Sequence, residues 1–218
     1  MSATETLRQS CHDTWTAATT HAFTDALADG TLDRDRMAGY LQQDYLFVEG
    51  FVRLLSAAIS TGPSLADVVP AAQFLGLICS EENTYFLRSF EALEVPATTA
   101  QPAPKTRAFQ QLMEDARLSG SYANMLAVLV VAEWSYLDWA SPHEARADDL
   151  PFWQGEWITL HAGEGFAGVV AYLRGQLDAV FPTLSAAEQD DVTRLFTRAV
   201  ELERGFFDAA WAGFAVAR

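Results

Sequence analysis

Three carboxylates interrupt helix faces that are otherwise apolar. Asp44, Glu133 and Glu203 each lie at helical spacing among Leu, Val, Phe and Tyr residues, where an apolar side chain is expected. Glu82 is a weaker fourth case. Burying one unpaired carboxylate costs several kcal/mol unless it is protonated or hydrogen-bonded. Each position alone is equally compatible with a carboxylate bonded to a neighbouring helix, but the set predicts a shared polar pocket.

Aromatic side chains accompany these carboxylates and indicate what the pocket binds. A flat ring can stack on them while a carboxyl group hydrogen-bonds its ring nitrogen and amino group. Taken singly, each aromatic residue is more typical of a core. We expect the set to line a closed pocket for a small nitrogen heterocycle. The candidate lining residues are Phe47, Phe109, Tyr136, Trp139, Trp153 and His161.

Carboxylates held at different pKa values in one water-poor pocket can perform acid and base catalysis on a bound ring. The candidates for this chemistry are Glu203, Glu133 and Glu82. One of them would activate a water molecule, and another would protonate the leaving nitrogen. Helix periodicity fixes faces and not distances, so the assignment of acid and base stays open.

Motifs for metals and cofactors are missing from the sequence. A di-metal helical bundle needs Glu-x-x-His on two helices, and none of the four histidines has a glutamate three positions earlier. The glycine-rich phosphate loops and the HExxH and GxSxG motifs are also absent. Cys11 and Cys79 are isolated, which argues against a disulfide or zinc site. We expect no metal and no cofactor.

The elements that must position these residues are predicted to be helices throughout a single domain, 1–218. Apolar residues recur at helical spacing, and no segment shows sustained strand-like alternation. A connector is expected at 95–104, and a bend near Pro70. Capping boxes are indicated by the Ser2/Glu5 and Ser185/Glu188 pairs. The expected helices cover 5–28, 33–60, 64–93, 106–118, 122–140, 151–181 and 185 to the C-terminus.

Composition excludes several classes of partner. With 14 basic and 29 acidic residues the net charge is −15, and this field repels nucleic acids and anionic membranes. The most apolar run, 125–132, is too short to cross a bilayer, and the N-terminus lacks the pattern of a signal peptide. We therefore expect a cytoplasmic protein whose partner is a small molecule.

Four segments resemble the TenA family (thiaminase II), whose members share the haem-oxygenase-like helical fold. The resemblance spans nearly the whole chain, and the segments are more specific in combination than singly. They are Trp15 with His21-Ala22-Phe23, the run YLQQDYLF at 40–47, EWSY at 133–136 and ERGFFDAA at 203–210.

The better-known branch of that family uses a cysteine nucleophile on its central helix, and Ala132 stands at that position here. The chain is more similar to a second branch, which lacks the cysteine and carries a glutamate beside it, here Glu133, with Phe109 in place of a tyrosine. That branch is associated with hydrolysis of formylaminomethyl or aminomethyl pyrimidines, which are breakdown products of thiamin.

The resemblance also implies roles for individual residues. Asp44 would bind the amino group and ring edge of the pyrimidine, Glu203 would handle a ring-nitrogen proton, and Tyr136 and Phe47 would line the site. A homodimer or homotetramer is implied as well. Two other interpretations stay open: a non-catalytic pyrimidine-binding or regulatory protein that kept the pocket, and an oxidase or oxygenase on the same fold.

Overall fold

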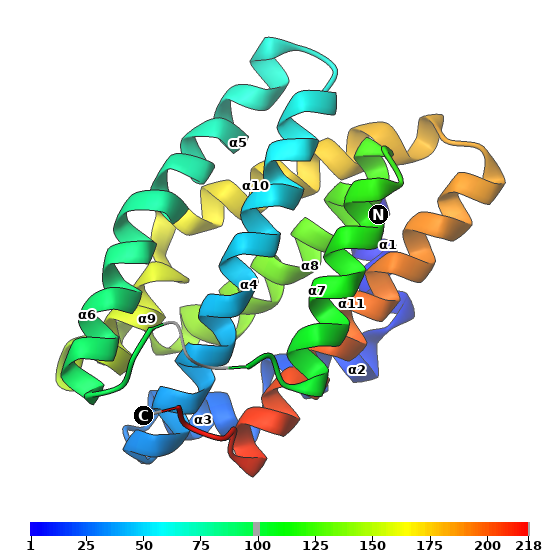
Figure 1. Ribbon diagram of the computed structural model, residues 1–218. Coiled ribbons are helices and arrows are strands. Elements are labelled where there is room, and N and C mark those ends of the chain that lie inside the picture. The colour runs from blue at the N-terminus through cyan, green and yellow to red at the C-terminus, as the bar shows by residue number, and fades with distance from the viewer. Residues whose placement is uncertain (98–100, 218) are drawn as a thin grey trace.

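The structure is a computed structural model that describes residues 1–97 and 101–217. Helices make up this part of the chain, and it contains no strand, so the all-α prediction is confirmed (Figure 1). The α-helices are α1 (Ala3–Ser10), α2 (His12–Thr19), α3 (Ala22–Ala28), α4 (Arg34–Thr61), α5 (Leu65–Leu77), α6 (Asn83–Leu93), α7 (Pro104–Leu118), α8 (Tyr122–Ala140), α9 (Phe152–Leu160), α10 (Gly163–Val180) and α11 (Ala186–Ala212).

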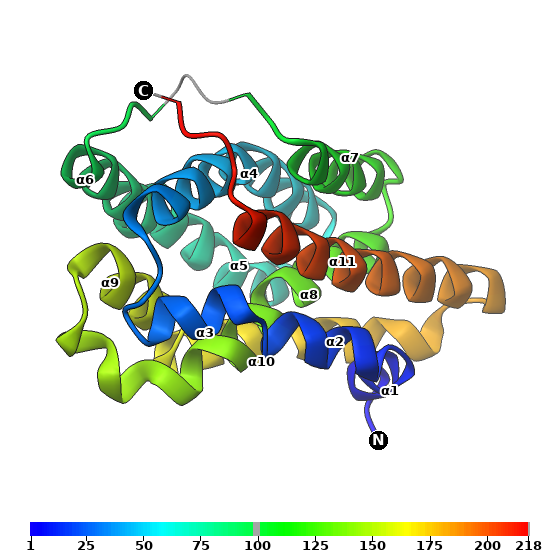
Figure 2. The ribbon, with the colours of Figure 1, turned by 90° about the horizontal axis from the view of Figure 1, so that it is seen from below.

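Helix α8 is the centre of the fold. Its run from Met125 to Val131 is buried on every side, as expected for a helix without a polar face. Helices α4, α7, α10 and α11 all pack against it, and Figure 2 shows it enclosed between them. The Ser121 side chain caps the helix by accepting from the Asn124 N–H. The predicted bounds of this helix are confirmed.

The caps fix where the other long helices begin. The Asp33 side chain accepts from the Arg36 N–H at the start of α4. Ser185 and Glu188 form the predicted capping box at the start of α11. The other predicted capping box is half formed. Ser2 accepts from the Glu5 N–H, but the Glu5 carboxylate pairs with Arg8 instead of returning to Ser2.

The single helix expected over 5–28 is wrong. Breaks at Cys11 and Thr20 divide it into α1, α2 and α3, and these short helices follow the surfaces of α10 and α11. A straight helix could not keep contact with both. His21 caps α3, its Nδ1 accepting from the Phe23 N–H at 3.0 Å.

The helix expected over 64–93 is interrupted, but not at Pro70. Helix α5 continues through Pro70, and a π-helical segment at Ile78–Glu82 separates it from α6. Pro70 comes only five residues after the helix begins, so it removes one backbone hydrogen bond near that end. A π-helical segment adds a residue to a turn and is frequent at functional sites.

Two further helix bounds differ from expectation. The helix expected over 151–181 divides into α9 and α10 before Gly163, whose φ of 74° favours glycine. Helix α11 ends at Ala212, before Gly213 with φ of 96°, so it does not reach the C-terminus.

Two buried glutamines on α4 attach the irregular segments to the bundle. Gln42 exchanges hydrogen bonds with the backbone of Ala217. Gln43 accepts from the Ala103 N–H and the Thr106 hydroxyl. Part of the predicted connector at 95–104, namely 98–100, lies outside the described residues. These contacts hold the start of α7 and the segment after α11 beside α4, which carries Asp44.

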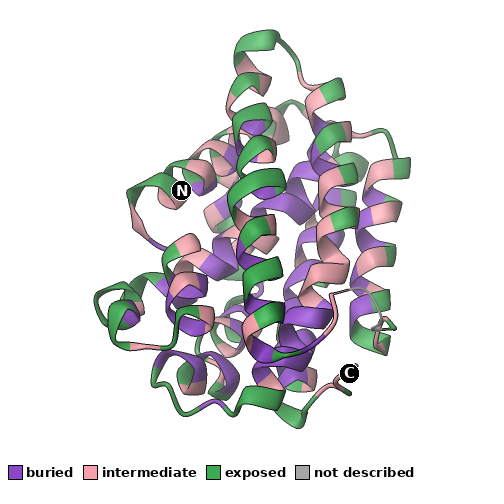
Figure 3. Cartoon of the chain, turned by 60° about the vertical axis from the view of Figure 1, so that its left-hand side comes forward, coloured by how far each residue is buried: buried purple, intermediate pink, exposed green. Residues whose placement is uncertain are grey.

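Buried side chains lie on the inward faces of the helices, and the outward faces are exposed (Figure 3). Over the described ranges, no helix combines the length and the apolar character that a membrane crossing requires.

Candidate active site

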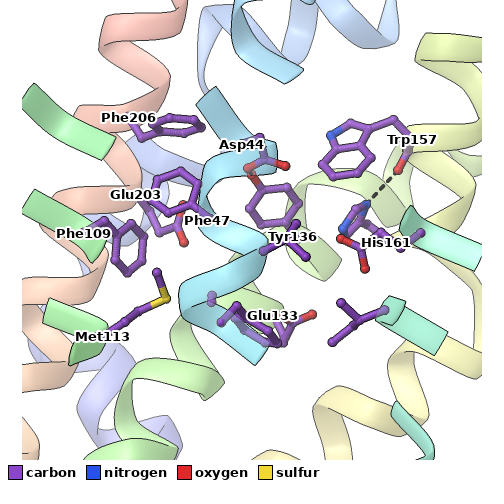
Figure 4. Close-up of a pocket in the computed structure, with 15 residues that line it drawn as sticks. Asp44, Phe47, Phe109, Met113, Glu133, Tyr136, Trp157, His161, Glu203 and Phe206 are labelled. Carbon is purple, nitrogen blue, oxygen red and sulfur yellow. Dashed lines mark hydrogen bonds between the residues drawn. The ribbon is translucent and has the colours of Figure 1, made fainter. Parts of the chain in front are cut away.

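One pocket lies between α4, α7, α8 and α11, with an empty volume of about 620 Å³ that includes space open to solvent. The four carboxylates singled out in the sequence all line it. Figure 4 shows Asp44, Glu133 and Glu203 pointing into the same space from three helices. The lining residues are Asp44, Phe47, Val48, Phe51, Ile78, Glu82, Phe109, Met113, Ala132, Glu133, Tyr136, Trp157, His161, Glu203 and Phe206.

Different elements supply each carboxylate. Asp44 comes from the middle of α4, Glu133 from α8 and Glu203 from α11, while Glu82 is the last residue of the π-helical segment. Glu203 is 3% exposed. The other three are partly buried, and their side chains line the pocket. The lining contains no Lys or Arg, so no cation of the protein neutralises the four acids there.

Burial raises the pKa of all four carboxyls, and the charge of neighbouring carboxylates adds to the rise for Asp44, Glu133 and Glu203. Burial raises the pKa of Glu82 to about 7. The pKa of Asp44 is raised well above its usual range, mainly by burial and then by the charge of Glu82. Burial, followed by neighbouring carboxylates, raises the pKa of Glu133 and of Glu203 in the same way. Burial thus favours the protonated form of these carboxyls, which can donate as well as accept hydrogen bonds.

A chain of buried hydroxyls fixes one of these acids. The Trp157 Nε1–H donates to the Tyr40 hydroxyl at 3.1 Å, and the Tyr40 and Tyr136 hydroxyls lie 2.8 Å apart. The Tyr136 hydroxyl in turn donates to Asp44 Oδ1 at 3.5 Å. Burial raises the pKa of both tyrosines well above the usual range, so both stay protonated. The chain therefore directs a proton of Tyr136 toward Asp44.

Removing the Tyr40 hydroxyl should destabilise the protein because it leaves the buried Trp157 N–H without an acceptor. Tyr40→Phe is expected to lower the free energy of unfolding by about 1–3 kcal/mol, measured by urea denaturation. Tyr45→Phe is the matched control, since the Tyr45 hydroxyl donates to Asn83 in a partly buried setting where water can replace it. Equal losses in the two variants would contradict the role of the chain.

His161 contributes a neutral ring to the pocket wall. Its Nδ1 donates to the Trp157 carbonyl at 2.8 Å (Figure 4). Burial lowers the pKa of His161 to about 4, so the ring is neutral at pH 7. With the proton on Nδ1, the other nitrogen, Nε2, is a hydrogen-bond acceptor.

Four of the six predicted lining residues besides the carboxylates are brought together, namely Phe47, Phe109, Tyr136 and His161. Trp139 and Trp153 do not line the pocket, and their placement there is wrong. Trp139 is buried one turn beyond Tyr136, and its Nε1 lacks a hydrogen-bond partner within the described residues. Trp153 lies at the start of α9, where the Arg34 guanidinium covers its ring. Each lies about one helical turn from a lining residue, Tyr136 on α8 or Trp157 on α9, and that distance along the helix places it outside the pocket.

Several lining residues were not identified from the sequence. Phe51 and Phe206 belong to the same apolar stripes as Asp44 and Glu203, so stripe membership could have found them. Ile78, Met113 and Trp157 each lie four residues from a candidate site residue, namely Glu82, Phe109 and His161, so helical spacing could have found them as well. They complete an apolar wall around the acids.

Ala132 lines the pocket at the position compared above with the family cysteine. Cys79 is exposed and Cys11 is buried elsewhere, and neither lines the pocket. Over residues 1–97 and 101–217, no three His, Cys, Asp or Glu side chains are grouped in a way that could hold a metal ion.

Comparisons with known proteins place this pocket in a family context. The model of the TENA/THI-4/PQQC family matches residues 8–213. A relative from Halalkalibacterium halodurans, named aminopyrimidine aminohydrolase, is 26% identical over 216 residues, which cover 97% of this chain and 96% of the relative. The solved structure of a TenA homologue from P. horikoshii has a TM-score of 0.85 at 22% identity, covering 98% of this chain and 100% of that one.

A second solved structure, from Shewanella denitrificans, is described as a domain with a heme oxygenase-like fold. It matches with a TM-score of 0.69 at 16% identity, over 95% of this chain and 91% of that one. The predicted fold is thus confirmed. Since the family model covers nearly the whole sequence, the chain belongs to the TENA/THI-4/PQQC family.

Proposed function

We propose that this protein is a hydrolase of thiamin salvage that acts on aminomethyl or formylaminomethyl pyrimidines. The observation that carries the proposal is the aromatic pocket in which Asp44, Glu82, Glu133 and Glu203 meet without a basic side chain. An aminopyrimidine can donate from its amino group to the carboxyl oxygens and brings a positive charge to a lining that has no Lys or Arg. The relative named aminopyrimidine aminohydrolase supports the same reaction class.

In this proposal the pyrimidine ring lies between Phe47 and Tyr136. Asp44 accepts from the amino group and ring edge, and the hydroxyl of Tyr136 keeps that carboxyl in place. Burial raises the pKa of Glu203 and so favours its protonated form, which can donate to a ring nitrogen. Protonating the ring draws electrons away from the carbon that reacts.

Hydrolysis requires a water oxygen to bond to the carbon that carries the leaving nitrogen, while the carbon–nitrogen bond breaks and the nitrogen takes a proton. Glu133 and Glu82 are the candidates for base and acid. Burial, and then the charges of Glu82 and Asp44, raises the pKa of Glu133, so the pocket can hold an ionised and a protonated carboxyl at one pH. The ionised one takes the proton of water, and the other delivers a proton to the nitrogen.

A thermal-shift panel with turnover assays tests the proposal. The panel contains thiamin, the aminomethyl pyrimidine, its formyl derivative and the hydroxymethyl product. A ligand held at 100 times its Kd stabilises the folded state by about 2.7 kcal/mol, so binding appears as a raised midpoint. The proposal expects a raised midpoint together with release of ammonia or formate. Binding without turnover would instead support a non-catalytic pyrimidine-binding protein, and no binding would reject both.

We also infer a homodimer or homotetramer in the cytoplasm. Large apolar side chains are exposed on several helices, with Leu65 79%, Leu118 66% and Trp211 39% exposed. Burying such side chains between copies would stabilise an assembly. Light scattering after size-exclusion chromatography measures the mass, and a monomer would contradict the inference.

A further inference from the structure

A second pocket, with an empty volume of about 900 Å³, adjoins the candidate active site. It lies where the end of α5 and the π-helical segment face the junction of α9 and α10. Five lining residues are exposed, which places this pocket at the surface: Leu77, Glu81, Glu144, Thr159 and Gly165. The remaining lining residues are Phe74, Glu82, Leu160, His161, Ala162, Gly163, Phe166 and Val169.

Glu82 and His161 line both pockets, so these two side chains form the partition between them. His161 is only 7% exposed, and its Nδ1 is engaged by the Trp157 carbonyl. In the part of the chain that the structure describes, its Nε2 makes no hydrogen bond. An acceptor that faces the pockets without a donor from the protein is available to a hydrogen-bond donor of a ligand.

The position of Glu82 allows it to yield to a ligand. It ends the π-helical segment, where the widened turn interrupts the regular backbone hydrogen bonds. The Glu82 carboxyl has no hydrogen bond within the described residues, and the His161 ring has one, through Nδ1. Rotation of these two side chains can therefore open the partition without movement of the backbone.

We propose that the outer pocket is the access chamber through which the protonated aminopyrimidine reaches the active site, passing between Glu82 and His161. This inference rests on the proposed function. Glu81 and Glu144 give the chamber a negative potential, and its lining contains no Lys or Arg. A cationic amine is drawn into such a chamber and can donate first to Glu82 and then to Nε2 of His161. A phosphorylated pyrimidine is repelled.

Two tryptophan substitutions on α10 separate access from binding. Gly165 lines the chamber, whereas Gly168 does not, and a Cβ at either position meets no atom within 4 Å. Gly165→Trp places an indole in the chamber, and Gly168→Trp places one on the neighbouring exposed turn. Both variants change the same helix in the same way, so Gly168→Trp is the matched control.

The experiment measures association and dissociation of the aminomethyl pyrimidine by stopped-flow fluorescence, with Kd from calorimetry. An obstruction in the access route slows both rates and leaves Kd unchanged. For Gly165→Trp we expect both rates to fall at least about tenfold, with Kd within about twofold of wild type and Gly168→Trp unaffected. In wild type, added salt should slow association of the cationic amine more than that of the neutral formyl derivative.

Distinct results overturn the two proposals. Wild-type association by Gly165→Trp would reject this access route and leave the proposed function standing. A weakened Kd with unchanged association would also reject it, since that pattern indicates damage to the inner pocket. If the wild-type protein binds no pyrimidine at all, the proposed function fails and the access route fails with it.

Discussion

Glu203→Gln is expected to lower kcat for hydrolysis of the aminomethyl pyrimidine about 10²- to 10⁴-fold, the usual contribution of a general acid or base. The Glu203 carboxyl lines the pocket and is 3% exposed. In the proposed mechanism it holds the proton that activates the ring. Gln keeps the size and an N–H donor but cannot transfer a proton, so KM should change far less than kcat.

Folding of this variant should not suffer. Burial disfavours the ionised form of Glu203, and a neutral amide removes that cost. Glu201→Gln is the matched control, because Glu201 is exposed on the same helix and pairs with Arg198. Steady-state kinetics and urea denaturation measure the two effects. Wild-type turnover in Glu203→Gln would remove this residue from the mechanism.

The ligand-free protein should lose stability as pH rises from about 6.5 to 8. Burial raises the pKa of Glu82 from 4.5 to about 7. Above pH 4.5 the folded state holds a proton on Glu82 that the unfolded chain has released. It loses this proton as the pH passes about 7, so stability falls with pH and the fall ends near pH 8. Glu82 alone accounts for about 1 kcal/mol over this window. Asp44, Glu133 and Glu203 add to the loss, since their pKa values are also raised.

At lower pH, titration of His161 changes the stability in the opposite direction. Its pKa falls from 6.5 to about 4 on folding, so the unfolded chain binds the extra proton there and stability rises with pH through that range. Above pH 6.5 the ring is mostly neutral in both states and its effect fades. The carboxyls therefore set the sign of the slope between pH 6.5 and 8, and His161 reduces its size near pH 6.5.

Urea denaturation at several pH values between 6.5 and 8 measures this slope. Glu82→Gln should flatten it, because the amide does not titrate, and Glu81→Gln at the neighbouring exposed position should leave it unchanged. Identical slopes for wild type and Glu82→Gln would contradict the buried, raised pKa of Glu82.

The helical class and the site carboxylates were readable from the sequence because both follow from periodicity. A 3.6-residue period identifies which side chains share a face, and so Asp44, Glu133 and Glu203 could be assigned to inward stripes. Caps and glycines then located the bounds of α8 and the start of α11, since these depend on residues close in the chain.

Tertiary packing alone decided the rest. Trp139 and Trp153 were misplaced because periodicity gives a direction around a helix and not a depth along it. The breaks at Cys11 and Thr20 have no strong local signal, since they arise where short helices follow α10 and α11. Whether four acids meet in one pocket depends on how helices distant in sequence cross. That is a property of side-chain packing between them, which no single segment encodes.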